Sequence, residues 1–154
     1  MSTIEESIDV NVPVQTAYNQ WTQFEDFPQF MEGVQEVRQL DDKRLHWTAE
    51  IAGQKREWEA EIAEQIPDER VAWTSTSGDV MHAGVVTFHR IDDNQTRVML
   101  QMGFEPSNFG EKAADAMGLV KRRVKGDQER FKEFIESRGQ ETGAWRGKID
   151  QPSS

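Results

Sequence analysis

The sequence predicts an α+β fold in which a curved antiparallel sheet of seven strands wraps around one long C-terminal helix, with two short helices after the first strand. Three observations carry this prediction. Apolar and polar residues alternate with the period of a strand in residues 3–12 and again between residues 34 and 104. Short turn segments separate the later strands. After Pro106 the apolar residues recur with the period of a helix.

The first strand and the two short helices follow from the residues around two prolines. The first strand is expected over residues 3–12 and ends at Pro13. A helix follows over residues 14–21, because its apolar residues fall at helical spacing and proline suits a helix start. Residues 24–32 are expected to form a second short helix or a compact loop around Pro28.

Six further strands are expected, because their separators carry turn chemistry and are mostly two to five residues long. Connections this short predict an antiparallel meander. The alternation is clearest where Trp58, Ala60 and Ile62 alternate with glutamates, so one face of that strand should be buried and the other solvated. The expected strands are residues 34–40, 45–51, 54–66, 70–76, 84–91 and 96–104.

The long helix is expected over residues 109–138, because apolar residues recur along one of its sides. Asn108 and Glu111 make a variant of the capping box at its start, and Gly139 marks its end.

The remaining residues, 139–154, are expected to form a polar tail. Trp145 is the one residue in it that we expect to be able to dock onto the body of the protein. The chain of 154 residues therefore divides into a single domain, residues 1–138, and this tail.

Composition excludes several classes of protein. Acidic residues outnumber basic ones by 28 to 18, a formal net charge of -10, so nucleic acid and anionic membranes are not expected partners. The absence of cysteine excludes disulfides and zinc sites built on thiolates. The N-terminus does not resemble a signal peptide, and no run of about 18 apolar residues occurs. We expect a soluble cytoplasmic protein without integral membrane association, and the sequence sets no oligomeric state.

One basic cluster departs from this acidic balance. Its members could hold a phosphate, an acidic partner or a lipid headgroup. However, Arg122 lies opposite the apolar stripe of the expected helix, as a solvated helix face requires. The cluster consists of Lys121, Arg122, Arg123 and Lys125.

A single helix fills a strongly curved sheet poorly, so we expect a gap between them of the kind that takes apolar ligands. The element order and three segments, at residues 21–37, 71–91 and 102–106, resemble the START-like polyketide cyclase/dehydrase and lipid-transport (SRPBCC) superfamily, and more narrowly its bacterial coenzyme Q-binding branch. The resemblance covers residues 1–138 and implies the helix-grip (START/Bet v1-like) fold. The superfamily includes lipid carriers, aromatase/cyclases and oxygenase domains, so it implies no single function.

The expected cavity wall consists of inward-facing strand positions, the aromatic segment of residues 24–31, which we expect to act as a lid, and two positions on the long helix. Three tryptophans on one concave face suit a flat aromatic or isoprenoid ligand. The expected wall residues are Phe24, Phe27, Phe30, Met31, Trp47, Arg56, Trp58, Trp73, Phe88, Met102, Phe104, Met117 and Val120.

Three polar residues share this inward side. His82 could hydrogen-bond a ligand carbonyl or act as an acid or base, although its place beside a Ser-Gly-Asp turn favours an exposed side chain. Arg56 could anchor a carboxylate or quinone oxygen, although pairing with a neighbouring carboxylate is the favoured interpretation. Asp127 interrupts the apolar helix stripe, so we expect a nearby arginine or the wet end of the cavity beside it.

Neither a metal nor a cofactor is expected, because His46 and His89 fall on the outer side of their strands and ligands do not converge. The leading hypothesis is a non-enzymatic binder or carrier of a hydrophobic small molecule, such as a quinone, isoprenoid, lipid or polyketide. A second is a metal-independent aromatase/cyclase that uses His82 or Arg56 as its acid/base group. A third is a module that binds a protein partner and has a filled core.

Overall fold

In the computed structural model, the described backbone covers residues 2–51, 53–78, 82–104 and 113–149, and the described side chains exclude residues 2, 51, 104 and 113–117. The elements follow the predicted order. They are β1 (Ser2–Val10), α1 (Val14–Trp21), the 3-10 helix η1 (Phe24–Gln29), β2 (Val34–Gln39), β3 (Arg44–Ile51), β4 (Gln54–Ile66), β5 (Arg70–Gly78), β6 (His82–Asp92), β7 (Gln95–Phe104) and α2 (Ala113–Arg138).

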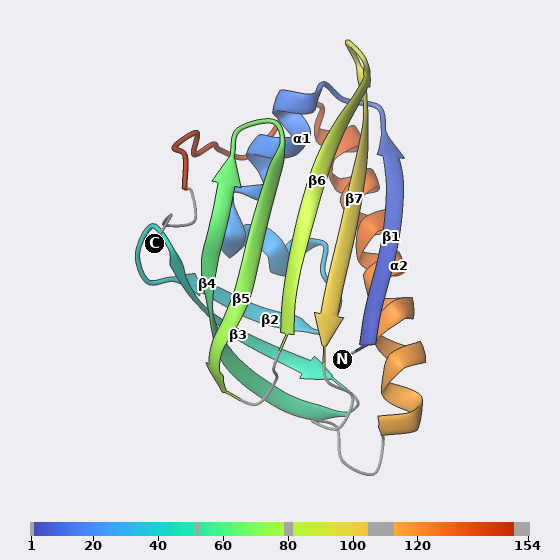
Figure 1. Cartoon of the computed structure of the whole chain (residues 1–154). Helices are drawn as coiled ribbons and strands as arrows, with labels where there is room; N and C mark the ends of the chain where they lie inside the picture. The colour runs from blue at the N-terminus through green and yellow to red at the C-terminus, as the bar shows by residue number, and fades with distance from the viewer. Residues whose placement is uncertain (1, 52, 79–81, 105–112, 150–154) are drawn as a thin grey trace.

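The seven strands form one antiparallel sheet in the order β1-β7-β6-β5-β4-β3-β2. Figure 1 shows the sheet curling around α1 and α2, which lie on one of its faces. Two register shifts in the β4–β5 pairing, between Glu59 and Ala60 and between Ile62 and Glu64, contribute to the curl because bulges bend a strand. The predicted helix-grip architecture is therefore confirmed.

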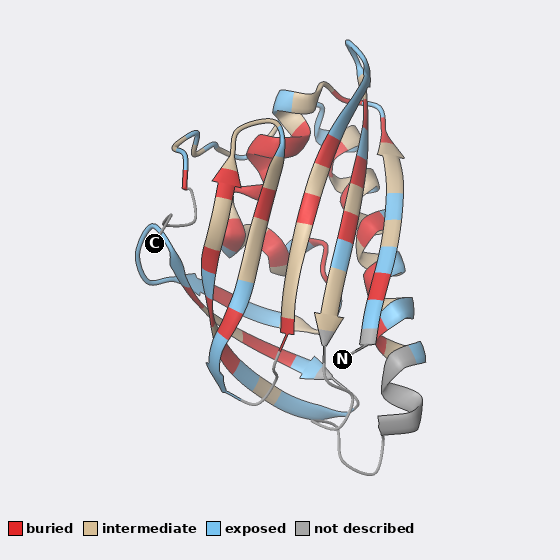
Figure 2. Ribbon diagram, viewed as in Figure 1, coloured by how far each residue is buried: buried red, intermediate tan, exposed pale blue. Residues whose placement is uncertain are grey.

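Burial follows the predicted strand period. Buried and exposed positions alternate along the strands, and in β4 Trp58, Ala60 and Ile62 are buried while Glu57, Glu59 and Glu61 face outward or remain partly exposed (Figure 2). Boundaries differ by a few residues, since β5 continues to Gly78 and β6 begins at His82. The expected start of the long helix, with Asn108 and Glu111, lies outside the described residues.

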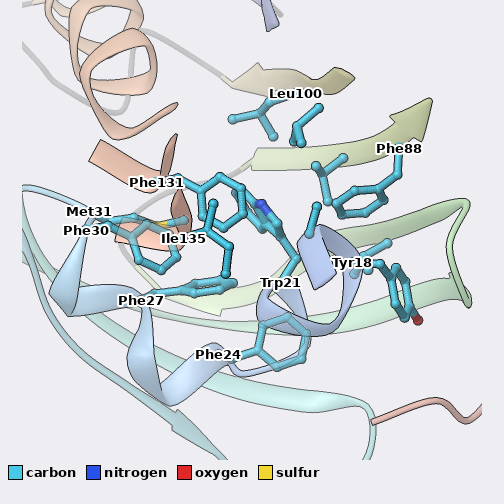
Figure 3. Close-up of a cluster of buried hydrophobic side chains, with 14 of the residues drawn as sticks. Tyr18, Trp21, Phe24, Phe27, Phe30, Met31, Phe88, Leu100, Phe131 and Ile135 are labelled. Atoms are coloured by element: carbon cyan, nitrogen blue, oxygen red, sulfur yellow. The ribbon is translucent and has the colours of Figure 1, made fainter. Parts of the chain in front are cut away.

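An aromatic cluster joins η1 to the long helix (Figure 3). In η1 the 3-10 geometry places residues three apart on the same side, so Phe24 and Phe27 both turn inward. Trp21 lies between η1 and α2, with its ring centroid 5.2 Å from that of Phe27 and 5.5 Å from that of Phe131. Phe30 packs on Phe131 at 5.3 Å. These rings close one end of the space between the sheet and α2.

The C-terminal tail is docked by more than the one residue expected. The Trp145 backbone N–H donates to the Thr22 hydroxyl at 3.0 Å. The Arg146 guanidinium donates to the Asn19 side-chain oxygen at 2.6 Å. Ile149 and Gln65 exchange two backbone hydrogen bonds. Gln65 lies near the end of β4, beyond the residues that pair with β3. Hydrogen bonds from the backbone and from polar side chains therefore help to hold the tail.

The aromatic cluster should be a main source of stability. Phe30→Ala is expected to lower the free energy of unfolding by about 3 to 5 kcal/mol, because the side chain is 2% exposed and its removal leaves a cavity among large rings. Urea denaturation gives the value. Leu40→Ala is the control, since Leu40 is 40% exposed and should change stability by less than about 0.5 kcal/mol. Equal losses in the two variants would contradict this assignment of the core.

Candidate functional site

The described residues line a cavity of about 160 Å³ between the sheet, η1 and α2. Its wall is almost entirely apolar, and the few polar groups come from β6, α2 and the connection after η1. The lining residues are Trp21, Phe24, Phe27, Met31, Glu32, Val34, Leu45, Trp47, Ala49, Trp58, Ile62, Val71, Trp73, His82, Val86, Leu100, Met102, Val120, Arg123, Val124, Asp127 and Gln128.

The cavity brings together most of the wall residues expected from the sequence. Those that line it are Phe24, Phe27, Met31, Trp47, Trp58, Trp73, Met102 and Val120. The side chains of Phe104 and Met117 lie outside the described residues. Whether the lining residues bind a ligand remains a prediction.

Three expected wall residues lie elsewhere. Phe30 packs against Phe131 in the aromatic cluster, and Phe88 packs edge-on against Tyr18 of α1 with ring centroids 5.4 Å apart. Arg56 is half-buried and is not among the lining residues. Strand parity places Phe88 on the inward side correctly but does not show that it meets α1 there. Phe30 was expected in the wall as part of the aromatic segment, and it packs against α2 instead.

One wall of the cavity carries three tryptophans. Trp47 and Trp58 sit opposite each other on β3 and β4 and stack with ring centroids 5.8 Å apart and planes at 10°. Trp58 also meets His82 edge-on at 5.3 Å. Trp73 lies opposite Gly84, where a Cβ would collide with the indole ring. The glycine therefore makes room for the third tryptophan of the wall.

His82 is buried in this wall rather than exposed. Its side chain is 8% exposed and lines the cavity, and neither ring nitrogen has a hydrogen-bond partner among the described residues. Burial lowers the pKa of His82 to about 4, so the imidazole is neutral at pH 7. The expectation of an exposed histidine was wrong because β6 begins at His82 itself, where its backbone N–H donates to the Ser75 hydroxyl at 2.9 Å.

Asp127 pairs with an arginine, as its position in the apolar stripe of the helix predicted. Its Oδ1 accepts a hydrogen bond from Arg130 at 2.5 Å and another from the backbone N–H of Glu32 at 3.0 Å. Arg130 also donates to the Phe30 carbonyl at 3.1 Å. Burial raises the pKa of Asp127 to about 6, even though Arg130 opposes the shift. The group fastens the connection between η1 and β2 onto α2 at the polar edge of the cavity.

The basic cluster on α2 divides between two environments. Lys121, Arg122 and Lys125 are exposed, as the solvated helix face predicted. Arg123 instead lines the cavity and donates to the Glu50 carbonyl. Gly33 has a positive φ of 86° and lies so close to Arg123 that a Cβ would overlap the guanidinium. Sequence reasoning missed this inward arginine because Arg123 sits at the edge of the apolar stripe.

Gln128 is a lining residue that the sequence did not single out. Its side chain is 3% exposed, and its amide nitrogen donates to the backbone carbonyls of Glu6 and Val98, each at 3.3 Å. The only available signal was a second polar residue next to Asp127 in the helix stripe. A buried amide on the cavity wall therefore adds a polar position that the sequence analysis lacked.

The histidines do not converge. His46 contacts Glu57 and Glu59 on the outer face, and His89 is exposed with its ring beside the Thr87 hydroxyl. Within the part of the chain that the structure describes, no three His, Asp or Glu side chains are placed to hold a metal ion together. The described helices include none with the length and hydrophobicity needed to span a membrane.

Comparison with known proteins adds a family and a set of structural neighbours. A family model described as polyketide cyclase/dehydrase and lipid transport matches residues 10–133. An uncharacterised 17.2 kDa protein of Streptomyces lincolnensis is 62% identical over 149 residues, covering 97% of this chain and 99% of that protein.

Two solved structures share the fold. The Zhui aromatase/cyclase from Streptomyces sp. R1128 has a TM-score of 0.78 at 13% identity, with 94% of this chain and 99% of that chain covered. A START superfamily protein from Mycobacterium smegmatis has a TM-score of 0.64 at 15% identity, with 83% and 97% covered. Identities this low show the architecture alone.

His82→Gln should change the pH dependence of stability. The unfolded chain takes up a proton at this histidine below about pH 6.5, whereas the folded state does not until about pH 4, so its contribution to stability falls as the pH falls through that window. The variant lacks this loss and should gain about 2 to 3 kcal/mol relative to wild type between pH 7 and pH 4. Urea denaturation at both pH values measures the difference. The control is His89→Gln, and an equal gain there would contradict burial as the cause.

Asp127→Asn should change the pH dependence of stability in the direction opposite to that of His82→Gln. The folded state takes up a proton at Asp127 near pH 6, well before the unfolded chain does near 3.8, so wild type gains stability from this group as the pH falls between those values. The variant should lose about 2 to 3 kcal/mol relative to wild type between pH 7 and pH 4. Glu129→Gln, at an exposed neighbouring position, is the control. A difference between variant and wild type that does not vary with pH would refute the assignment.

Proposed function

We propose that this chain, which belongs to the polyketide cyclase/dehydrase and lipid-transport family, binds or carries a hydrophobic small molecule in the cavity between its sheet and α2. The family match confirms the resemblance to the SRPBCC superfamily without singling out the coenzyme Q-binding branch. The observation that carries the proposal is the cavity itself, an apolar space walled by stacked tryptophans with few polar groups in its lining.

The aromatic lining of the cavity favours an aromatic or conjugated group. Trp47 and Trp58 stack on each other in the wall, and an aromatic ligand ring can pack against the surface that they form. The volume of about 160 Å³ is close to that of a protein cavity known to take a benzene-sized molecule, about 150 Å³. The ring of a quinone or polyketide, or a short part of an isoprenoid or acyl chain, would fit. A longer ligand requires the aromatic segment of residues 24–31 to move away from α2.

The state of His82 favours binding over catalysis. A general acid or base works best with a pKa near the operating pH, and a pKa of about 4 leaves the imidazole without a proton to give at pH 7. A neutral imidazole carries one donor and one acceptor, and both ring nitrogens of His82 are fully buried in the wall rather than open to the cavity. No metal or other cofactor enters this proposal.

One observation favours the aromatase/cyclase alternative. That hypothesis predicted that His82 lies at the cavity, and His82 is among the lining residues. It requires in addition that a bound ligand raise the pKa of His82 toward neutrality. The partner-binding alternative required a filled core, which the cavity does not favour. We propose a bacterial cytoplasm as the setting, in line with the Streptomyces relative and the cysteine-free composition.

A residue that fills the cavity should weaken binding. Val86→Phe places a ring in the cavity, because Val86 is buried and lines it, whereas Val85→Phe changes the opposite face of the same strand. We expect Val86→Phe to weaken binding of the single-ring probe p-xylene by about tenfold or more, since it removes the space for about 1.4 kcal/mol or more of apolar contact. Isothermal titration calorimetry measures the affinity. Val85→Phe should bind like wild type, and equal binding by all three proteins would place the probe outside the cavity.

A further inference from the structure

Arg123 is a cationic residue at the edge of the apolar cavity. It lies on α2, lines the cavity and is half-buried, and its guanidinium donates to the Glu50 carbonyl near the end of β3. Gly33 leaves room for this arrangement, because a Cβ there would overlap the guanidinium. The side chain therefore extends along the edge of the cavity from the helix to the sheet.

The carboxylates at this edge pair with a different arginine. Glu32 and Asp127 both line the cavity. Arg130 binds both of them, with Nη1 3.3 Å from a Glu32 oxygen and Nη2 2.5 Å from an Asp127 oxygen. Among the described residues, no carboxylate forms an ion pair with Arg123. The positive charge of Arg123 is therefore not neutralised by direct contact with an acidic side chain in that part of the chain.

The guanidinium of Arg123 keeps donors that another molecule can reach. A guanidinium carries several N–H donors and no acceptor. Within the described residues its hydrogen bond is to the Glu50 carbonyl, and none of its nitrogens is buried without a partner, in contrast to both ring nitrogens of His82. The remaining N–H groups can therefore meet water or an acceptor on a bound molecule. A carboxylate matches the planar fork of the guanidinium best.

We infer that Arg123 binds the carboxylate of an amphiphilic ligand whose apolar ring or chain occupies the cavity. This inference rests on the proposed binding function. A half-buried position suits the contact, because a carboxylate there keeps part of its hydration, whereas full burial among the tryptophans would be costly. The ligand class is thereby narrowed from any hydrophobic molecule to an aromatic or acyl carboxylic acid.

The neighbouring basic residues give a control for the effect of charge alone. Lys121, Arg122 and Lys125 are exposed on the same helix, in a chain whose formal net charge is -10. Their field favours the approach of an anion to α2. Of the four basic residues in this cluster, Arg123 alone lines the cavity. Removing the charge of Lys125 therefore changes the field without removing the contact.

Three probes that share a p-tolyl ring test the inference. p-Xylene has no polar group, and 4-methylbenzamide is a neutral molecule of nearly the same shape as the ionised 4-methylbenzoate. Isothermal titration calorimetry at pH 7 of wild type, Arg123→Met and Lys125→Met gives the affinity of each. We expect the affinity of 4-methylbenzoate relative to 4-methylbenzamide to fall about tenfold in Arg123→Met and by less than about twofold in Lys125→Met.

The outcomes separate the two proposals. If no probe binds wild type, the binding function fails. If the probes bind but the ratio is unchanged in Arg123→Met, or falls equally in Lys125→Met, only the role of Arg123 is overturned. Retained binding of p-xylene shows that Arg123→Met is folded. Should that variant not fold, the Nε–Hε resonance of Arg123 in wild type decides the question, since it should shift more with 4-methylbenzoate than with 4-methylbenzamide, and equal shifts would overturn the inference.

Discussion

The structure depends on one packing constraint, which is that the long helix α2, the short helix α1 and one short aromatic segment have to cover the concave face of a seven-stranded sheet (Figure 1). At one end large rings do so, with Trp21, Phe30 and Phe131 in mutual contact. Toward the other end the small side chains Val120 and Val124 of α2 line the cavity together with the tryptophans of β3 and β4. The cavity is the space left between them, so its walls are apolar for the same reason that the core is.

Three buried polar groups depart from this apolar pattern. His82 and Gln128 keep atoms without partners among the described residues, and Asp127 is held by Arg130. Burial moves the pKa values of His82 and Asp127 in opposite directions, so their effects on the pH dependence of stability largely offset each other. Polar groups of this kind cost stability in a packed core unless they are paired, as Asp127 is.

The sequence predicts the architecture well because strand alternation and helix period are local properties. The same alternation placed Trp47, Trp58 and Trp73 correctly on the inner face. It failed where a second element decides the outcome. Phe88 faces inward but is covered by α1, and Phe30, which was placed in the wall as part of the aromatic segment, packs against α2. Partners distant in sequence likewise decide the burial of Gln128 and the docking of the tail, and no pattern within one element records them.

Native mass spectrometry of the protein purified from its own host, followed by solvent extraction, tests the central claim most directly. The claim is that the space beneath α2 is an accessible binding cavity rather than a packing defect. The account predicts a stoichiometric hydrophobic small molecule that is released on denaturation. A mass equal to that of the bare chain, both as purified and after incubation with ubiquinone, a fatty acid or a neutral apolar dye, would contradict it.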